Sequence, residues 1–240
     1  MRTAVVSCHV ERPLDDRTWT AFSRLQAQRP GGFAIAALIR PPDAEAGENE
    51  ALWLARARIA AAHGPLGHHT HWGGPTRARP AEGDPAGRVR REAEWLRERG
   101  LKPALFCGGG WYMDEDVAAA LAELGYTDCT ATSFRPDYLP PAAARLSLAE
   151  PAWLRVRAAR LLEVPTTHSL GMALRAAVGP LPQHVHAYFH DTDLLDGRRR
   201  RALQVALALL GRRRQPSDLA GVTAETEIPF AEAAGDNRHG

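Results

Sequence analysis

The chain opens with Thr3-Ala4-Val5-Val6-Ser7-Cys8-His9-Val10, followed by Glu11. This run is short, rich in β-branched residues and polar at its end, which predicts a buried strand whose carboxyl end carries His9 and Glu11. Two further stretches repeat the pattern, namely His68-His69-Thr70-His71-Trp72 and His184-Val185-His186-Ala187-Tyr188-Phe189-His190-Asp191. Imidazoles and carboxylates gathered at strand ends indicate a metal-dependent site.

Strands and helices alternate along the rest of the chain. Predicted strands cover residues 3–10, 33–39, 66–71, 103–107, 126–132, 161–165 and 184–189, and predicted helices cover 15–28, 50–62, 88–99, 114–124 and 197–210. About seven such units predict an α/β fold, with a parallel sheet that closes into a distorted, TIM-like (β/α) barrel. We expect one domain over residues 1–219 and a C-terminal tail over 220–240.

Composition narrows the class of protein. The chain has 240 residues, 45% of them hydrophobic, and a formal net charge of +2. Its only lysine is Lys102, and arginines are offset by acidic residues, so we expect no nucleic-acid partner. The arginine runs 198–201 and 212–214 flank an apolar helix, where a solvated helix face is favoured over contact with phosphate or an anionic glycan.

The cysteines and the apolar segments indicate the compartment. Cys8, Cys107 and Cys129 are widely spaced and form no Cys-x-x-Cys pair, so they predict neither a disulfide framework nor a zinc ribbon. No apolar run has the length of a transmembrane segment or of a signal-peptide core. We therefore expect a soluble, cytoplasmic protein.

Polar clusters follow most of the predicted strands. In parallel barrels the loops after the carboxyl ends of the strands build the active site. The clusters that we expect on this rim are His9 with Glu11, His69 with His71, Cys107 with its glycines, residues 166–168, and His190 with Asp191.

The second histidine stretch is the centre of the predicted metal site. His69 and His71 are two residues apart, so an extended backbone directs both imidazoles to one face. Alone, such a pair is equally typical of a surface loop. Glu11 or His9, at the end of the first strand, supplies a third ligand and favours the metal site.

The last strand ends in His190-Asp191. A carboxylate beside an imidazole can hold one tautomer and keep the ring partly protonated, as a general acid requires. The alternative is that Asp191 caps the following helix. We expect His184 and His186 to line the barrel.

A glycine-rich loop, Gly108-Gly109-Gly110-Trp111-Tyr112, follows the fourth strand. It lacks the lysine and the glycine spacing of a phosphate-binding loop. Its glycines allow close approach of backbone N–H groups to an oxyanion, and Trp111 or Tyr112 can stack on a sugar ring. Covalent acyl transfer through Cys8 or Cys107 is a weaker alternative, because no base partner stands at nucleophile spacing.

These motifs resemble those of the polysaccharide deacetylase family, the NodB-homology domain, over about residues 3–210. His9-Val10-Glu11 is similar to the first-strand motif Asp-x-Asp/Glu, and His69-Thr70 matches the start of His-Ser/Thr-x-x-His. The loop from Cys107 to Trp111, with Leu124-Gly125-Tyr126 after the next helix, looks like the family's Arg-x-Pro-aromatic loop. His190 resembles the acid histidine of the closing strand.

Three positions depart from the family pattern. His9 stands where the family has its base aspartate, and Cys107 stands where it has an arginine. Gly73 occupies the place of the second metal histidine, with His71 the nearest replacement. Arg135, after the next strand, is the candidate to replace the missing arginine.

The resemblance implies a divergent, seven-stranded barrel that acts as a metal-dependent hydrolase. Its substrate would be an N-acetylated sugar or glycoconjugate. Glu11, His69 and His71 would hold Zn²⁺ or a similar divalent ion. His9 would be the base, backbone amides of residues 110–112 would face the oxyanion, and His190, supported by Asp191, would protonate the leaving amine.

Two alternatives stay open. The first is a catalytically silent barrel that binds a glycan or a partner through Trp72, Trp111 and Tyr112, and the departures at His9 and Cys107 favour it. The second is another metal-dependent hydrolase that cleaves a carbon–nitrogen bond in a small metabolite. The sequence carries no prediction of an oligomeric state.

Overall fold

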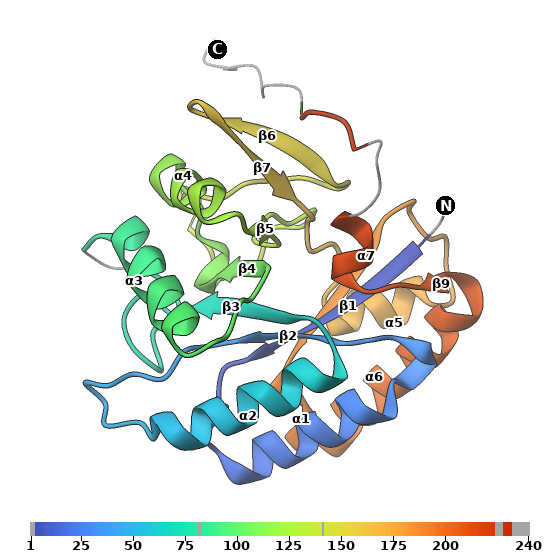
Figure 1. Cartoon of the computed structure of the whole chain (residues 1–240). Helices are drawn as coiled ribbons and strands as arrows, with labels where there is room; N and C mark the ends of the chain where they lie inside the picture. Colours follow the sequence, from blue (N-terminus) through green and yellow to red (C-terminus); the bar gives the residue numbers. More distant parts are fainter. Residues whose placement is uncertain (1–2, 81–82, 141, 224–227, 232–240) are drawn as a thin grey trace.

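The computed structural model describes residues 3–80, 83–140, 142–223 and 228–231 (Figure 1). Its strands are β1 Thr3–Val10, β2 Ala36–Ile39, β3 Leu66–Thr70, β4 Leu105–Gly108, β5 Thr127–Asp128, β6 Ala152–Val156, β7 Ala159–Glu163, β8 Val185–His190 and β9 Gln215–Pro216. Its α-helices are α1 Asp16–Gln28, α2 Glu50–His63, α3 Pro85–Glu98, α4 Glu115–Leu124, α5 Leu170–Ala176, α6 Gly197–Arg213 and α7 Leu219–Thr223. Short 3₁₀ turns are η1 Pro30–Gly32, η2 Gly109–Trp111 and η3 Asp191–Leu195.

The strands of the described ranges form one sheet in the order β6-β7-β5-β4-β3-β2-β1-β8, with β9 beside the start of β1. Neighbouring strands are parallel, except in the β6–β7 hairpin. The predicted α/β fold with a mostly parallel sheet is confirmed. Closure into a seven-stranded barrel stays a prediction, because the strand order has two ends. Backbone hydrogen bonds do join His168, after β7, to His186 and Tyr188 of β8.

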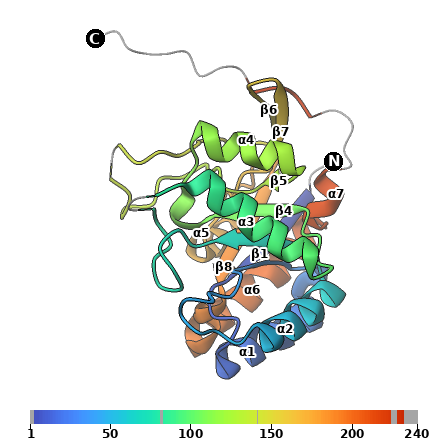
Figure 2. The same ribbon diagram turned by 60° about the vertical axis from the view of Figure 1, so that its left-hand side comes forward.

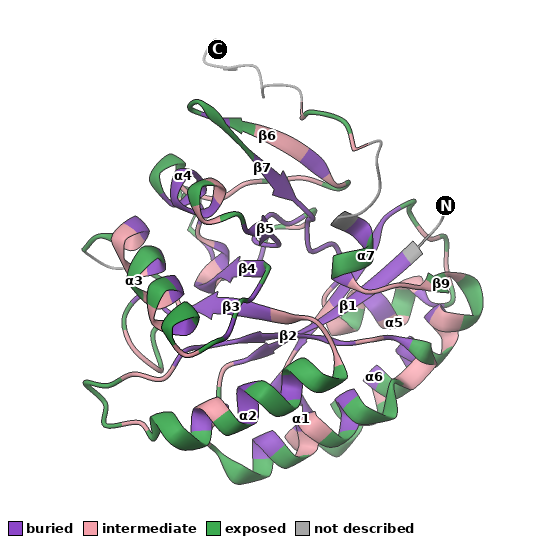
Figure 3. Ribbon diagram, in the orientation of Figure 1, coloured by how far each residue is buried: buried purple, intermediate pink, exposed green. Residues whose placement is uncertain are grey.

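The outer face of the sheet is covered by helices. Alternate residues of β1, such as Val6 and Cys8, pack against Phe22 of α1 and Leu207 of α6 in one apolar cluster. Figures 1 and 2 show α1, α2 and α6 side by side along this part of the sheet, with α3 and α4 beside β3 to β5. Figure 3 shows that the central strands are largely buried, whereas the β6–β7 hairpin is partly exposed and the exposed residues of α1 and α2 face away from the sheet.

The inner face holds a second apolar cluster beneath the strand ends. Val5, Leu38 and Leu105 pack there with Leu219 and Val222 of α7. Because Val222 is buried, the predicted boundary between residues 219 and 220 falls within α7, an element that packs into the domain. Further along, Ala231 N–H donates to the Trp153 carbonyl of β6 over 2.9 Å.

Helices begin and end at the capping residues that the sequence provides. The carboxylate of Asp114 accepts the Val117 N–H over 2.8 Å, and α4 ends at Gly125, whose φ of 72° is left-handed. The strand predicted at 126–132 is only two residues long. Beyond it, the Ala131 N–H donates to the Glu163 side-chain carboxylate, over 2.9 Å, and not to the backbone of a neighbouring strand. The β6–β7 hairpin was missed, since its turn at Arg157 (φ 54°) carries no glycine or asparagine.

Among the described residues, no helix combines the length and the apolar character that a bilayer crossing requires.

Candidate functional site

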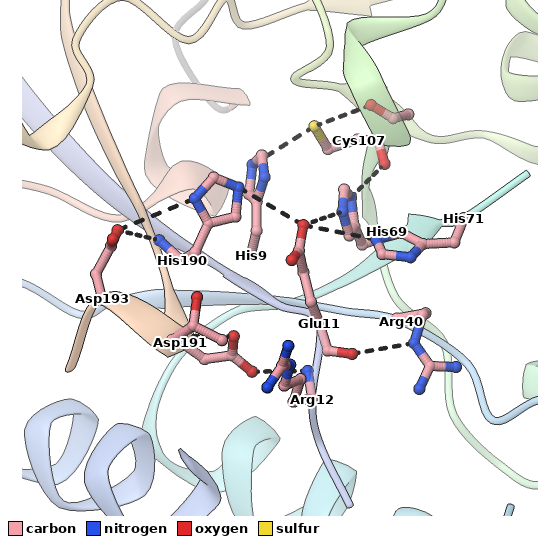
Figure 4. Close-up of polar contacts among 12 residues, drawn as sticks. His9, Glu11, Arg12, Arg40, His69, His71, Cys107, His190, Asp191 and Asp193 are labelled. Carbon is pink, nitrogen blue, oxygen red and sulfur yellow. Dashed lines mark hydrogen bonds and ion pairs between the residues drawn. The ribbon is translucent and has the colours of Figure 1, made fainter. Parts of the chain in front are cut away.

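The register of the sheet brings the predicted site residues to one edge. His9 of β1 is the Cα partner of His190 in β8, and His69 of β3 is the partner of Cys107 in β4. These residues lie at the carboxyl ends of their strands, so their side chains meet with that of Glu11, as Figure 4 shows.

Glu11, His69 and His71 form the first group of metal-ligand type. The Glu11 Oε1 atom lies 4.0 Å from His69 Nε2 and 3.6 Å from His71 Nε2. The candidate ligand atoms of the three residues all lie within 4.8 Å of one another. One carboxylate oxygen and two imidazole nitrogens are a donor set that suits Zn²⁺.

Backbone carbonyls set the tautomers of the two histidines. His69 Nδ1 lies 2.8 Å from the Cys107 carbonyl oxygen, and His71 Nδ1 lies 3.0 Å from that of Pro75. A carbonyl oxygen can only accept, so each Nδ1 carries the proton and each Nε2 offers a lone pair. Both Nε2 atoms are buried without a hydrogen-bond partner among the described groups. Metal-binding histidines characteristically donate their other N–H in this way, so the residues fit a metal ion.

Electrostatics favour the ligand forms of these groups. Burial lowers the pKa of His69 to about 3, which keeps the imidazole neutral. Burial alone would raise the pKa of Glu11, but the adjoining His71, His190 and His69 rings hold that pKa at about 2. A neutral imidazole beside a carboxylate is the pair that a divalent cation binds.

His9 is enclosed by rings. Its centroid lies 4.6 Å from that of His69, 5.2 Å from that of Trp111 and 5.1 Å from that of Tyr188. Burial lowers the pKa of His9 well below its usual value, so the ring is neutral. Its Nε2 lies 3.6 Å from the Sγ of Cys107, and these two residues with His69 form a second group of possible ligands.

The carboxylate beside His190 belongs to Asp193. Asp193 Oδ2 lies 4.0 Å from His190 Nδ1 and accepts the His190 N–H over 3.0 Å. Asp191 instead accepts the backbone N–H groups of Arg12 and Thr192, each over 2.8 Å. The structure thus places Asp191 as a backbone anchor, while His190 Nε2 faces Glu11 Oε1 over 3.6 Å.

The three aromatic residues predicted on the rim, Trp72, Trp111 and Tyr112, do not all lie together. Trp111 lies beside His9, and the φ values of Gly110 (63°) and Trp111 (61°) are both left-handed. Trp72 and Tyr112 contact each other with ring centroids 5.4 Å apart and pack in a separate cluster with α3 and α4. Trp72 Nε1 donates to the Gly109 carbonyl over 2.8 Å, so Trp72 stabilises the backbone of the glycine-rich loop.

Three residues near the site were missed from the sequence. Tyr188 alternates with His190 in β8, and that spacing was a usable signal. Arg40 donates from Nε to the Glu11 carbonyl over 3.1 Å and pairs with Glu48 at 2.6 Å. For Asp193, the only signal in the sequence was its position three residues after His190. Arg135, the suggested replacement for the family's arginine, donates to the Pro140 carbonyl.

Comparisons with known proteins concern the fold. No family model matches the sequence, and no curated protein matches it. Similar solved structures include the 4-alpha-glucanotransferase from Thermococcus litoralis, with a TM-score of 0.56 and 11% identity. That match covers 95% of this chain, which spans only 39% of the glucanotransferase chain. The family 4 carbohydrate esterase from Streptomyces lividans, solved with acetate, matches with a TM-score of 0.54 and 10% identity. The match covers 95% of this chain and 97% of the esterase, so over nearly its whole length the chain shares the fold of a family 4 carbohydrate esterase.

Proposed function

We propose that the chain is a metal-dependent hydrolase that removes an N-acetyl group from a sugar or glycoconjugate. The observation that carries the proposal is the pair of buried, unpartnered Nε2 atoms of His69 and His71 beside the Glu11 carboxylate. The fold shared with a carbohydrate esterase supports it.

Glu11, His69 and His71 would hold the ion. A divalent metal such as Zn²⁺ would act as a Lewis acid toward the acetamide carbonyl and the attacking water. The backbone carbonyls of Cys107 and Pro75 keep the two ligand histidines in the tautomer that this binding needs.

The other site residues would move protons and hold the substrate. His9, kept neutral by burial, would accept a proton from the attacking water. His190, positioned by Asp193, would donate a proton to the departing amine as the carbon–nitrogen bond breaks, and acetate would be the second product. Trp111 is only 4% exposed and packs against His9 and Tyr188 at the edge of the site. Gly110 keeps its predicted role as a backbone donor, whereas the Tyr112 N–H already donates to the Gly109 carbonyl over 3.4 Å.

The test is His69→Ala. The variant loses one of the three ligands, so we expect it to lose both bound metal, measured by elemental analysis, and acetate release from N-acetylated sugars. His63→Ala is the matched control, because His63 is exposed at the end of α2. Full turnover by a folded His69→Ala variant would contradict the proposed site.

A second candidate is a catalytically silent, metal-binding protein of the same fold. The observation in its favour is the position of His9, which is only 3% exposed and faces Cys107. Purified protein that contains stoichiometric metal, yet releases no acetate from a panel of N-acetylated sugars, would favour this candidate. Release of an amine from a small metabolite instead would favour a different carbon–nitrogen hydrolase.

A further inference from the structure

A cavity of about 510 Å³ opens beside the candidate site. It lies between the start of α5, the end of β8 and the first turns of α6. Its lining includes Tyr188, His190 and Asp193, together with Leu170, Arg198 and Arg199. Because His190 Nε2 is 3.6 Å from Glu11 Oε1, the cavity adjoins the proposed metal ligands.

The cationic residues of this cavity come from the arginine run at the start of α6. Arg199 places Nη1 2.5 Å from Asp193 Oδ1, so one carboxylate both holds this guanidinium and contacts His190. Within the described ranges, Arg198 has no carboxylate within ion-pair distance of its side chain. The cavity wall therefore has more positive than negative charge.

The excess of positive charge continues beyond the cavity. A second hollow, of about 840 Å³, shares Arg198 and Ala202 with the first and is also lined by Arg200 and Arg201. The carboxylates that line the two hollows are those of Asp193 and Asp196, and Asp196 caps the first N–H groups of α6. Four arginines face two carboxylates, and the amino-terminal end of a helix adds further positive potential.

An arginine run on a helix is often only a solvated surface. Here two of its members line a cavity that also contains Tyr188 and His190, which contact His9 and Glu11. A neutral sugar needs no such charge. A guanidinium has the planar array of donors that matches a carboxylate or a phosphate.

We propose that this cavity binds an oxyanion carried by the substrate, so that the preferred ligand is an N-acetylated sugar bearing a phosphate or a carboxylate group. Arg198 contributes the attraction, and Arg199, held by Asp193, contributes directed N–H donors. The N-acetyl part of this inference rests on the proposed function, whereas the anion site rests on the cavity and its arginines.

The experiment measures binding by calorimetry. The ligands are N-acetylglucosamine, N-acetylglucosamine 1-phosphate and N-acetylmuramic acid, which are neutral, phosphorylated and carboxylated respectively. We expect the wild-type protein to bind at least one anionic sugar about tenfold more tightly than the neutral sugar. Arg198→Gln should remove most of that preference without altering the affinity for the neutral sugar.

Arg212→Gln is the matched control, because it removes the same charge from an exposed position at the far end of α6. Each titration is repeated after chelation, since an oxyanion can also bind a metal. A preference that persists without metal and falls in Arg198→Gln supports the cavity. Equal affinities for all three sugars, or an equal loss in Arg212→Gln, would overturn it. Because the titrations after chelation measure binding without turnover, failure of acetate release would count against the proposed function alone.

Discussion

Two buried carboxyl groups, those of Asp128 and Glu163, face each other across β5 and β7 as Cα partners. Asp128 Oδ1 accepts the Thr130 hydroxyl over 2.7 Å, and Glu163 Oε1 accepts the Ala131 N–H over 2.9 Å. Their other oxygens, Oδ2 and Oε2, accept from no N–H or hydroxyl donor among the described groups, and the two carboxyl groups are hydrogen-bonded to each other. Burial raises the pKa of both carboxyls, and that of Glu163 well above its usual value, so the fold favours the protonated form of Glu163.

Glu163→Gln should therefore change how stability depends on pH. The folded pKa of Glu163 is raised, so its contribution is present below the ordinary value of 4.5 and is lost as pH rises above that value. Glutamine does not titrate, and its amide can donate to ionised Asp128. We expect the variant to be more stable than the wild type by roughly 1 to 3 kcal/mol at about pH 8, measured by urea denaturation. Glu94→Gln, at an exposed position, should leave the dependence of unfolding free energy on pH unchanged. If Glu163→Gln showed the same dependence as Glu94→Gln, that result would contradict a proton shared between Asp128 and Glu163.

The strand that carries the ligand histidines is held by a neighbouring helix. Glu92 of α3 accepts from the Thr70 hydroxyl and pairs with His68 Nε2, each at 2.8 Å. It also pairs with Arg88, whose Nη1 donates to the Trp72 carbonyl over 2.9 Å. Burial alone would raise the pKa of Glu92, but His68 and Arg88 lower it, which keeps the carboxylate charged. The helix therefore fixes both ends of the His69–His71 segment.

Glu92→Ala tests this connection. The change leaves His68 and Thr70 without their partly buried acceptor, so we expect a loss of about 2 to 4 kcal/mol in the free energy of unfolding. Because His69 lies on β3 and His71 directly follows that strand, metal affinity should fall about tenfold, measured by competition with a chelating dye. Glu94→Ala, on the exposed face of the same helix, is the control. A variant that lost stability but kept wild-type metal affinity would show that the Glu92 contacts do not position the ligands.

The far end of the sheet's inner face is filled by a segment distant in sequence. Leu219 of α7 is fully buried and packs with Val5 and Val222 in the inner cluster. This contact joins β1 to α7, the last helix of the described residues, so the inner face depends on two segments that lie far apart in the sequence. The domain boundary predicted at residue 219 stays a prediction.

Leu219→Ala should destabilise the whole chain. Removing a fully buried leucine leaves a cavity, and we expect a loss of about 2 to 4 kcal/mol, measured by urea denaturation. Val178→Ala is the control, because Val178 is 77% exposed and should change stability by less than about 0.5 kcal/mol. A loss below about 1 kcal/mol in Leu219→Ala would mean that α7 is not part of the cooperative unit.

Much of the architecture could be inferred from local patterns. The strand predicted over residues 3–10 and the helix predicted over 114–124 agree with β1 and α4 to within one residue, because periodicity and capping depend on near neighbours. The same patterns placed His9, His69 and His190 at strand ends. The β6–β7 hairpin was not foreseen, since its turn uses a left-handed arginine.

Side-chain partners were decided by the packing of distant segments. The carbonyl that sets the tautomer of His69 belongs to Cys107, 38 residues away, and only strand register brings the two together. The turn after β8 directs Asp193, and not the adjacent Asp191, toward His190. The same turn places the start of α6 next to the end of β8, so that Arg198 and His190 line one cavity. Periodicity therefore established which residues reach the rim of the sheet, whereas partnership, charge and cavity shape arose only when segments far apart in the chain were packed, because side-chain contacts depend on separation in space.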